Sequence, residues 1–232
     1  MDQLRRQIHD AVSGIRIDFG GGCSVSKGYL MGWLIREYHI TNSVDIGVYR
    51  GRSLVPQAVA HKEFAHGKVY GVDPYLNAEA KETGNPSQQQ AIDKFIDGTD
   101  FPAIYGEVND LLRAFQLNEN CTLIRERSQD GIHYFEQEGI RFGLIHIDGN
   151  HDSDRVNSDV ALYLPRLTPG GFVVMDDVSW DSVKPALVTV ASRFYKIYER
   201  TDAWNDYAVF WDASSWISAS LLRLRLKWIG RD

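Results

Sequence analysis

Short apolar runs alternate with longer amphipathic segments along most of the chain. The runs are rich in β-branched residues and bounded by turn residues, which is typical of strands buried on both faces of a sheet. These runs are SVDIGV (43–48), KVYGVD (68–73), CTLIRER (121–127), FGLIHID (142–148) and GFVVMDD (171–177). The intervening segments with helical periodicity cover 51–64, 101–115, 129–139, 154–167 and 180–194. This alternation predicts an α/β protein with a parallel sheet covered by helices on both faces.

The pattern changes after the fifth run. FYKIYERT (194–201) and YAVFWDA (207–213) are separated by the short polar segment DAWND (202–206), which is typical of a β-hairpin. We therefore expect a doubly wound sheet of seven strands, mostly parallel, with an antiparallel C-terminal hairpin at one edge.

The chain is expected to form a single domain with two appendages. Residues 1–40 precede the first strand and have a helical pattern broken by GGG at 20–22, so we expect a helical cap on a core of residues 41–212. In the tail, 213–232, apolar and basic residues alternate. This tail could be a strand, an amphipathic helix, an oligomer contact or a weak membrane-surface element, and a packed or dimerising segment is favoured.

Composition narrows the class of protein. A formal net charge of −6 argues against non-specific nucleic-acid binding, which requires a basic face. The two cysteines, Cys23 and Cys121, lie far apart without metal-ligand spacing, which fits free thiols in a reducing cytosol. No apolar run approaches membrane-spanning length, and the charged N-terminus lacks the apolar core of a signal peptide. These features predict a cytoplasmic protein without a transmembrane segment.

The first candidate motif is the strand-to-helix turn VDIGVYRGRS (44–53). Gly47 and Gly51 lie where the chain must turn sharply and approach a ligand closely, and the following helix directs its N–H groups toward that ligand. Tyr49 stands where a dinucleotide fingerprint has its second glycine, so G-x-G-x-x-G is absent. Asp73 ends the second strand, where an acid typically binds a ribose diol. The alternative is an ordinary turn followed by a helix-capping aspartate.

The motifs D-x-G-x-x-x-G-x-S (45–53) and G-V-D-P-Y (71–75) resemble those of class I S-adenosylmethionine-dependent methyltransferases. The resemblance is strongest to the macrocin and cephalosporin-biosynthesis O-methyltransferase group, covers residues 42–212 and implies a Rossmann-like fold. It places Asp45 near the methionine part of the cofactor, Asp73 at the ribose and Ser128 beside the adenine, although Ser128 is equally well explained as a helix N-cap. The expected cofactor-binding residues are Asp45, Gly47, Tyr49, Gly51, Ser53, Asp73 and Ser128.

The second motif combines HIDGNHDSD (146–154) with the end of GGFVVMDD (170–177). Asp148 ends the fourth strand, and Asp176 and Asp177 end the fifth. In the resembled fold these two strands are neighbours. Adjacent strands lie about 4.8 Å apart, so their terminal carboxylates can share one cation, with Mg²⁺ preferred and Mn²⁺ or Ca²⁺ also suitable. The D-G-x-H and P-G-G…D-D patterns look like the metal site of the resembled group. The alternative is that Asp148 and Asp177 cap the turn and helix that follow them.

Three further side chains near this motif carry predictions. His151 could accept the proton of a substrate hydroxyl, and Asp148 is a rival base. His151 could equally orient the substrate or the cofactor, or it could be a solvent-exposed loop histidine. His146 lies inside a strand and is expected to be a packed, hydrogen-bonded core residue. Trp180 could line the acceptor pocket, although a packed aromatic at a helix start is favoured.

Together these residues predict methyl transfer from S-adenosylmethionine to a hydroxyl of a small molecule, such as a sugar or a catechol-like natural product. Mg²⁺ or Mn²⁺ chelated by neighbouring substrate oxygens would activate and position the hydroxyl. Residues 1–40 and 77–100 are the expected lids, and a homo-oligomer is compatible with the tail. The alternatives are a nicotinamide (NAD)-dependent oxidoreductase and a non-catalytic cofactor-binding protein.

Overall fold

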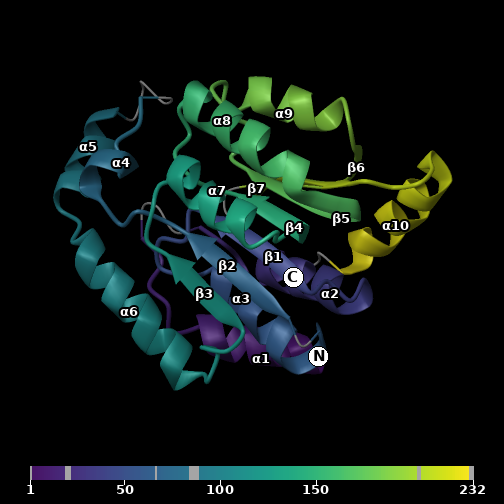
Figure 1. The fold of residues 1–232 in the computed structure, drawn as a ribbon, viewed down its shortest axis with the longest axis horizontal. Helices are drawn as coiled ribbons and strands as arrows, with labels where there is room; N and C mark the ends of the chain where they lie inside the picture. Colours follow the sequence, from purple (N-terminus) through teal and green to yellow (C-terminus); the bar gives the residue numbers. More distant parts are fainter. Residues whose placement is uncertain (1, 19–21, 66, 84–88, 203–204, 230–232) are drawn as a thin grey trace.

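The computed structural model describes residues 2–18, 22–65, 67–83, 89–202 and 205–229. A seven-stranded sheet runs through the molecule in the order β3-β2-β1-β4-β5-β7-β6 (Figure 1). The strands are β1 (Asn42–Ile46), β2 (Lys68–Val72), β3 (Cys121–Ile124), β4 (Phe142–Ile147), β5 (Leu167–Asp176), β6 (Tyr195–Asp202) and β7 (Asn205–Trp211). The first five pair in parallel, and β7 is antiparallel to both β5 and β6. The predicted Rossmann-like, doubly wound sheet is confirmed.

The strand order changes direction between β1 and β4. β1 pairs with β2 on one side and with β4 on the other, so that Asp45 lies opposite both Gly71 and His146. In an open α/β sheet, the crevice beyond the carboxyl ends of the strands at such a reversal is where ligands bind. The register therefore brings the ends of both predicted motifs to the same edge of the sheet.

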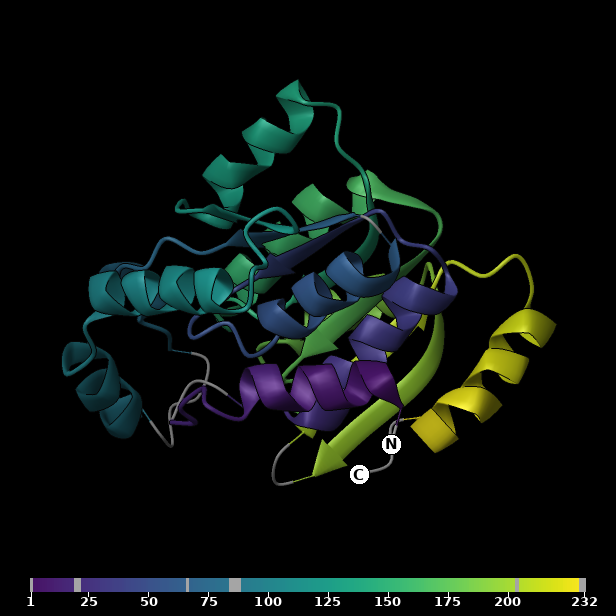
Figure 2. The same ribbon diagram turned by 90° about the horizontal axis from the view of Figure 1, so that it is seen from below.

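Helices cover both faces of the sheet (Figures 1 and 2). One face packs against α1 (Gln3–Val12), α2 (Val25–Glu37), α3 (Leu54–Ala60), α5 (Gln89–Asp97), α6 (Phe101–Ala114) and α10 (Trp216–Ile229). The other packs against α7 (Ser128–Gln137), α8 (Ser153–Tyr163) and α9 (Lys184–Ala191). Alternate strand residues supply the two cores: Phe172 belongs to the first and Val173 to the second. This alternation follows from the period of two in a strand.

Several helix boundaries differ from the sequence prediction. The helix expected over 51–64 begins at Leu54 and continues after Ala60 as a π-helical turn, η1 (His61–Ala65). The helix expected from Trp180 begins only at Lys184, because Pro185 favours the first turn of a helix and so marks its start. The polar stretch 77–90 contains a short helix, α4 (Asn77–Ala80), and a 3₁₀ turn, η2 (Leu164–Arg166), precedes β5.

The N-terminal cap consists of α1 and α2, which pack on each other and on α3. Gly20 and Gly21 of the predicted break lie outside the described residues. Arg52, just before α3, joins the cap to the core, because its guanidinium donates to the carbonyls of Val12, Ile15 and Cys23 at 3.1, 2.8 and 3.0 Å. The cap is therefore held directly against the segment that follows β1.

The tail forms an amphipathic helix, α10, at the β6 edge of the sheet (Figure 1). Ala219, Leu222 and Leu226 are buried and belong to the first core, which confirms a packed segment. None of the helices in the described part of the chain has the length and apolar composition needed to cross a bilayer.

Candidate functional site

A cleft of about 530 Å³ opens beyond the carboxyl ends of β1, β2, β4 and β5. Its lining includes residues of both predicted motifs: Gly47, Tyr49, Ser53, Asp73, Ser128, Asp148, His151, Asp176, Asp177 and Trp180. Residues 17, 18, 22, 23 and 27 of the cap and several residues between 76 and 96 complete its walls. The two segments expected to be lids therefore border the same cavity as the two motifs.

The turn from Gly47 to Ser53, here called the glycine loop, requires glycine at its first position. Gly47 has φ = +85°, and a Cβ there would lie 1.9 Å from the carbonyl oxygen of Asp148. Gly51 also has a positive φ, +80°, but the nearest atom to its Cβ would be 3.5 Å away. The end of β1 thus approaches the end of β4 at a distance that only glycine allows.

Asp73 organises the glycine loop from the end of β2. One carboxylate oxygen accepts from the backbone N–H groups of Val48 and Tyr49 at 3.0 and 2.9 Å, and the other accepts from that of Tyr75 at 2.7 Å. Burial raises the pKa of Asp73, and these three hydrogen bonds oppose the rise. A carboxylate offers about four lone-pair positions, so Asp73 can hold the loop and still accept from a diol in the cleft.

Asp45 lies beneath the cleft and not in its wall. It is fully buried and accepts a hydrogen bond of 2.8 Å from the Ser53 hydroxyl, while its other oxygen contacts Nδ1 of His146. Gly51 is likewise absent from the lining. The structure therefore places Ser53, Gly47 and Tyr49 at the cleft and Asp45 behind them as a support.

Ser128 lines the cleft as the first residue of α7, but it does not cap that helix. Its hydroxyl donates to the carboxylate of Asp159 on α8, and the N-cap position belongs to Arg127. Burial raises the pKa of Asp159 to about 6, although the Ser128 hydroxyl and Arg155 lower it. The N-cap interpretation of Ser128 is wrong, and its side chain instead ties α7 to α8 beside the cavity.

The cap also holds the glycine loop through Asp18, which the sequence analysis did not single out. Asp18 accepts from the Tyr49 hydroxyl at 2.9 Å and from Nε of Arg50 at 3.0 Å. Tyr49 itself has φ = +47° and packs against Phe95 and Phe101. The loop thus contacts Asp18 of one expected lid segment and Phe95 of the other, and both of these residues line the cleft.

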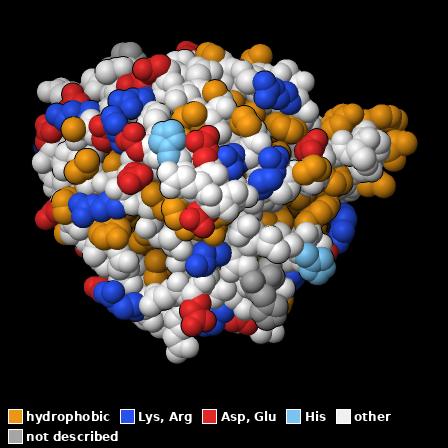
Figure 3. Space-filling view, viewed as in Figure 1, with side chains coloured by type: hydrophobic (Ala, Val, Ile, Leu, Met, Phe, Trp, Pro, Cys, Tyr) orange, Lys and Arg blue, Asp and Glu red, His pale blue; other side chains and the backbone are white. Residues whose placement is uncertain are grey.

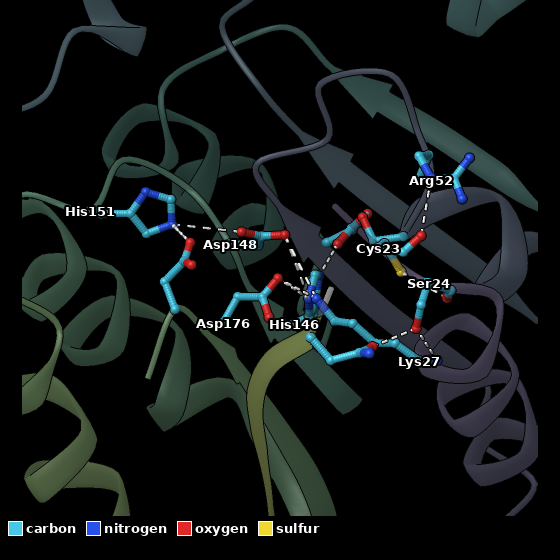
Figure 4. Close-up of polar contacts among 12 residues, drawn as sticks. Cys23, Ser24, Lys27, Arg52, His146, Asp148, His151 and Asp176 are labelled. Atoms are coloured by element: carbon cyan, nitrogen blue, oxygen red, sulfur yellow. Dashed lines mark hydrogen bonds and ion pairs between the residues drawn. The ribbon is translucent and has the colours of Figure 1, made fainter. Parts of the chain in front are cut away.

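The three predicted metal ligands all line the cleft, and a lysine lies beside two of them, Asp148 and Asp176 (Figure 4). Lys27 extends from α2, is only 2% exposed, and donates a hydrogen bond from Nζ to Asp176. The same Nζ lies 3.8 Å from Asp148. Burial alone would lower the pKa of Lys27, but the charges of Asp176 and Asp148 hold it above its usual range.

The two buried carboxylates respond to each other and to this lysine. Burial and the charge of Asp148 raise the pKa of Asp176 to about 7, against the opposing charge of Lys27. For Asp148, burial acts in the same direction, but Lys27 and His151 outweigh it and lower the pKa. One ammonium thus compensates most of the charge of the pair.

His146 completes this group from inside β4 and is fully buried. Because the Asp45 carboxylate can only accept, Nδ1 carries the hydrogen of their bond and Nε2 is left for the cleft side. Nε2 lies 4.0 Å from both Asp148 and Asp176, and it has no hydrogen-bond partner among the described residues. His146 is packed in the core, as the sequence predicts. The sequence did not predict that its Nε2 would be directed toward Asp148 and Asp176.

His151 lies on the opposite side of Asp148. Its Nδ1 and its backbone N each lie 2.9 Å from one oxygen of Glu82, and its Nε2 lies 2.7 Å from Asp177 and 3.7 Å from Asp148. The Trp180 ring is centred 5.0 Å from the imidazole. Burial lowers the pKa of His151, but Asp177 and the other carboxylates raise it well above its usual value. His151 is therefore part of the site and not an exposed loop histidine.

The capping interpretation of the aspartates does not hold. Asp177 contacts His151, and α9 begins seven residues later at Lys184, with Val183 as its N-cap. Asp148 contacts Lys27 and His151. These carboxylates face the cleft.

The donor set fits a divalent cation. Two groups of side chains have ligand atoms within 4.8 Å of one another: His146 with Asp148 and Asp176, and His151 with Asp148 and Asp177. Carboxylate oxygens suit Mg²⁺ and Mn²⁺, and the unpartnered Nε2 of His146, oriented by Asp45, matches the usual arrangement of a carboxylate supporting a metal-binding imidazole. Asp148 thus belongs to both groups, whereas Asp176 and Asp177 belong to different ones, and a single site for all three aspartates stays a prediction.

Sequence reasoning missed Lys27 and Glu82. A lysine in the middle of the apolar helix VSKGYLMGWLI is the signal that could have revealed the first, because a buried lysine requires an anionic partner. Glu82 carries no comparable signal, since it lies in a polar segment that meets His151 only through the tertiary fold.

Comparison with known families decides the class of this cleft. A family model described as a methyltransferase domain matches residues 44–178, which is more than half of the chain. The chain belongs to this methyltransferase family. The matched region extends from β1 to just beyond Asp177. It includes the glycine loop and the three aspartates Asp148, Asp176 and Asp177, here called the acidic group. The NAD-dependent oxidoreductase considered from the sequence is therefore set aside, while the narrower resemblance to the macrocin group stays a prediction.

Solved structures share the fold of this methyltransferase. The O-methyltransferase TomG from Streptomyces achromogenes, in complex with S-adenosylmethionine, has a TM-score of 0.60 at 14% identity, covering 91% of this chain and 90% of that one. The O-methyltransferase from Bacillus cereus, in complex with S-adenosylhomocysteine, also has a TM-score of 0.60, at 13% identity and 90% coverage of both chains. PaMTH1 from Podospora anserina, likewise bound to S-adenosylhomocysteine, has a TM-score of 0.57 at 13% identity, covering 92% and 89%. A comparison with curated protein sequences finds no match.

Proposed function

We propose that this methyltransferase transfers the methyl group of S-adenosylmethionine to a hydroxyl of a small molecule, such as a sugar or a catechol-like natural product. The observation that carries the proposal is that one cleft is lined by both the glycine loop with Asp73 and the acidic group of Asp148, Asp176 and Asp177. Similar folds solved with S-adenosylmethionine or its product support the choice of cofactor.

The cofactor end of the cleft would be formed by the glycine loop. Gly47 and Tyr49 would back the cofactor, and Asp73 would accept from the ribose hydroxyls while it holds the loop through Val48 and Tyr49. Ser128 would border the adenine. Asp45 would act from below by fixing Ser53. The main task of these residues is to hold the methyl carbon in line with the attacking oxygen.

The acceptor end would be formed by the acidic group and Trp180. Asp148, Asp176 and Asp177 are the proposed ligands of Mg²⁺ or Mn²⁺, which would lower the pKa of a bound hydroxyl and fix its position. Asp148 and His151 are the candidates for the proton acceptor. If Asp148 is the acceptor, His151 would orient Asp148 and Asp177, since its Nε2 lies 3.7 Å from the first and 2.7 Å from the second.

Cofactor binding is the first test. We expect calorimetry to show that the protein binds S-adenosylhomocysteine and not NAD. Asp73→Asn should weaken this binding at least tenfold, because a hydrogen bond to a charged group contributes about 1.5–3 kcal/mol. Asp206→Asn, on the acceptor side of the cleft, is the matched control and should bind normally. Unchanged affinity in Asp73→Asn would contradict the assigned ribose site.

Turnover against a panel of diols and catechols separates an enzyme from a non-catalytic binder. We expect methyl transfer with Mg²⁺ and its loss in Asp148→Ala and Asp176→Ala. Full activity in metal-free buffer would remove the ion from the mechanism, and no turnover despite tight S-adenosylhomocysteine binding would favour the binder.

Both cysteines are free and buried, which supports the expected cytoplasmic location.

A further inference from the structure

The outer face of α10 carries a stripe of large apolar side chains, here called the exposed stripe. Its residues are Trp216, Ile217, Leu221, Leu224 and Trp228, each between 55% and 76% exposed. In the space-filling view they form the apolar group at the end of the molecule where α10 lies (Figure 3). Single exposed apolar residues are common on proteins, but five largely exposed ones on a single helix are unusual and indicate an interaction surface.

The helix is fixed so that this stripe faces outward. Leu222 and Leu226 are buried on the opposite side, and α10 packs along β6. Arg225 adds a contact to α2, because its guanidinium lies 3.4 Å from Glu37 and over the ring of Trp33. Turning the stripe inward would expose this buried face, so the helix is held with the stripe directed away from the core.

The charges on α10 indicate the nature of that partner. Residues 216–229 contain Arg223, Arg225 and Lys227 and no acidic residue, in a chain of net charge −6. At 3.6 residues per turn, Arg223 and Lys227 lie on one side of the exposed stripe and Arg225 on the other. Arg225 is paired with Glu37, so Arg223 and Lys227 supply most of the positive charge beside the stripe. Charges are screened over about 8–10 Å at physiological ionic strength, so acidic residues farther away than this contribute little for anything that contacts the stripe.

We propose that α10 is a membrane-surface helix that binds an anionic phospholipid bilayer. An apolar stripe flanked by cations, with a tryptophan near each end, suits the boundary between acyl chains and headgroups. The 14 residues of α10 span about 21 Å, which is too short to cross a core about 30 Å thick, so the helix lies in the surface. Pairing of α10 with α10 of a second copy would bring like charges together without an acidic partner on either helix.

The test is flotation of the full chain with vesicles of phosphatidylcholine containing roughly one third phosphatidylglycerol, against vesicles of phosphatidylcholine alone. We expect binding to the anionic vesicles, at least about tenfold weaker binding to the neutral ones, and weakening by salt. Leu221→Glu with Leu224→Glu should reduce binding at least about tenfold, because the stripe supplies the apolar contact. Val188→Glu, at a 68% exposed position on α9, is the matched control and should bind like the wild type.

Three results would overturn the proposal. They are absence of binding to anionic vesicles, equal loss of binding in the stripe variant and in Val188→Glu, and unchanged vesicle binding in a stripe variant that turns from dimer to monomer in light scattering. The last result would make the stripe an interface between copies. The exposed stripe lies outside the cleft, so binding of S-adenosylhomocysteine by the same variants confirms their folding and tests the proposed function separately.

Discussion

At the scale of single residues, the acidic group is balanced by a cation of the chain itself. Two unit charges 4 Å apart attract each other by about 4 kcal/mol at an effective dielectric constant of 20. Lys27 has one carboxylate in hydrogen-bond contact and a second at 3.8 Å, which offsets the cost of burying its ammonium. Removing this lysine would leave Asp176 without its hydrogen-bonded cation and facing the charge of Asp148.

Lys27→Met should therefore lower the free energy of unfolding by about 3–5 kcal/mol, the usual cost of breaking a buried ion pair by removing one partner. Urea denaturation measures this difference. Lys184→Met, which breaks an exposed pair with Asp181, should change stability by less than about 1 kcal/mol. Adding Asp176→Asn to Lys27→Met should restore part of the loss. Equal losses in the two lysine variants would show that Lys27 is not held by the carboxylates.

At the scale of elements, the site depends on how closely the ends of β1 and β4 approach each other. The backbone of Gly47 touches the carbonyl of Asp148, so the glycine loop and the first acidic residue are in direct contact. Gly51 has a similar φ, but a Cβ there would lie at ordinary contact distance, 3.5 Å or more, from its neighbours. The two glycines therefore separate the cost of backbone strain from the cost of a clash.

Gly51→Ala should cost about 1–2 kcal/mol of stability, because an L-residue is strained at positive φ. Gly47→Ala carries the same strain together with a clash against backbone, and should cost about 2–5 kcal/mol in total. It should also weaken binding of S-adenosylhomocysteine, because β1 and β4 must separate. Chemical denaturation and calorimetry of both variants provide the comparison, and equal destabilisation would show that the strands separate at little cost.

At the scale of the whole molecule, the sequence predicts the architecture well, because the apolar runs and the acidic residues that end them are both local features of the sequence. The apolar runs ending in Asp73, Asp148 and Asp176 define three strands and their carboxyl ends, and the parallel sheet then brings those ends together. The role of Lys27 depends on how α2 docks across the sheet, which periodicity does not encode. Glu82 and Asp18 likewise reach the cleft only through tertiary packing.

The dependence of stability on pH is also a property of the whole molecule. A buried group whose pKa differs between the folded and unfolded states changes the free energy of the cooperative unfolding transition as the pH changes. Burial lowers the pKa of His61 to about 4, and its Nε2 lies 2.9 Å from the hydroxyl of Ser43. Above the unfolded pKa of about 6.5 both states carry a neutral imidazole. As pH falls from 6.5 toward 4, only the unfolded chain takes up a proton, so this residue makes the free energy of unfolding fall by up to about 1.4 kcal/mol per pH unit.

His61→Gln should remove this contribution and flatten the dependence of stability on pH between 6.5 and 4. His133→Gln, at an exposed histidine on α7, is the control and should leave the slope unchanged. Denaturant titrations at several pH values measure both slopes. A wild-type slope retained in His61→Gln would assign the acid sensitivity to other groups.

Beneath the floor of the cleft, Ser53, Asp45 and His146 form one unbroken row of hydrogen-bonded side chains. The row begins at the proposed cofactor end of the cleft and ends 4.0 Å from the carboxylates of Asp148 and Asp176. We therefore expect a substitution of Ser53 or Asp45 to change the orientation of the His146 imidazole as well. An attempt to change the acceptor specificity should therefore redesign the residues at both ends of this row together.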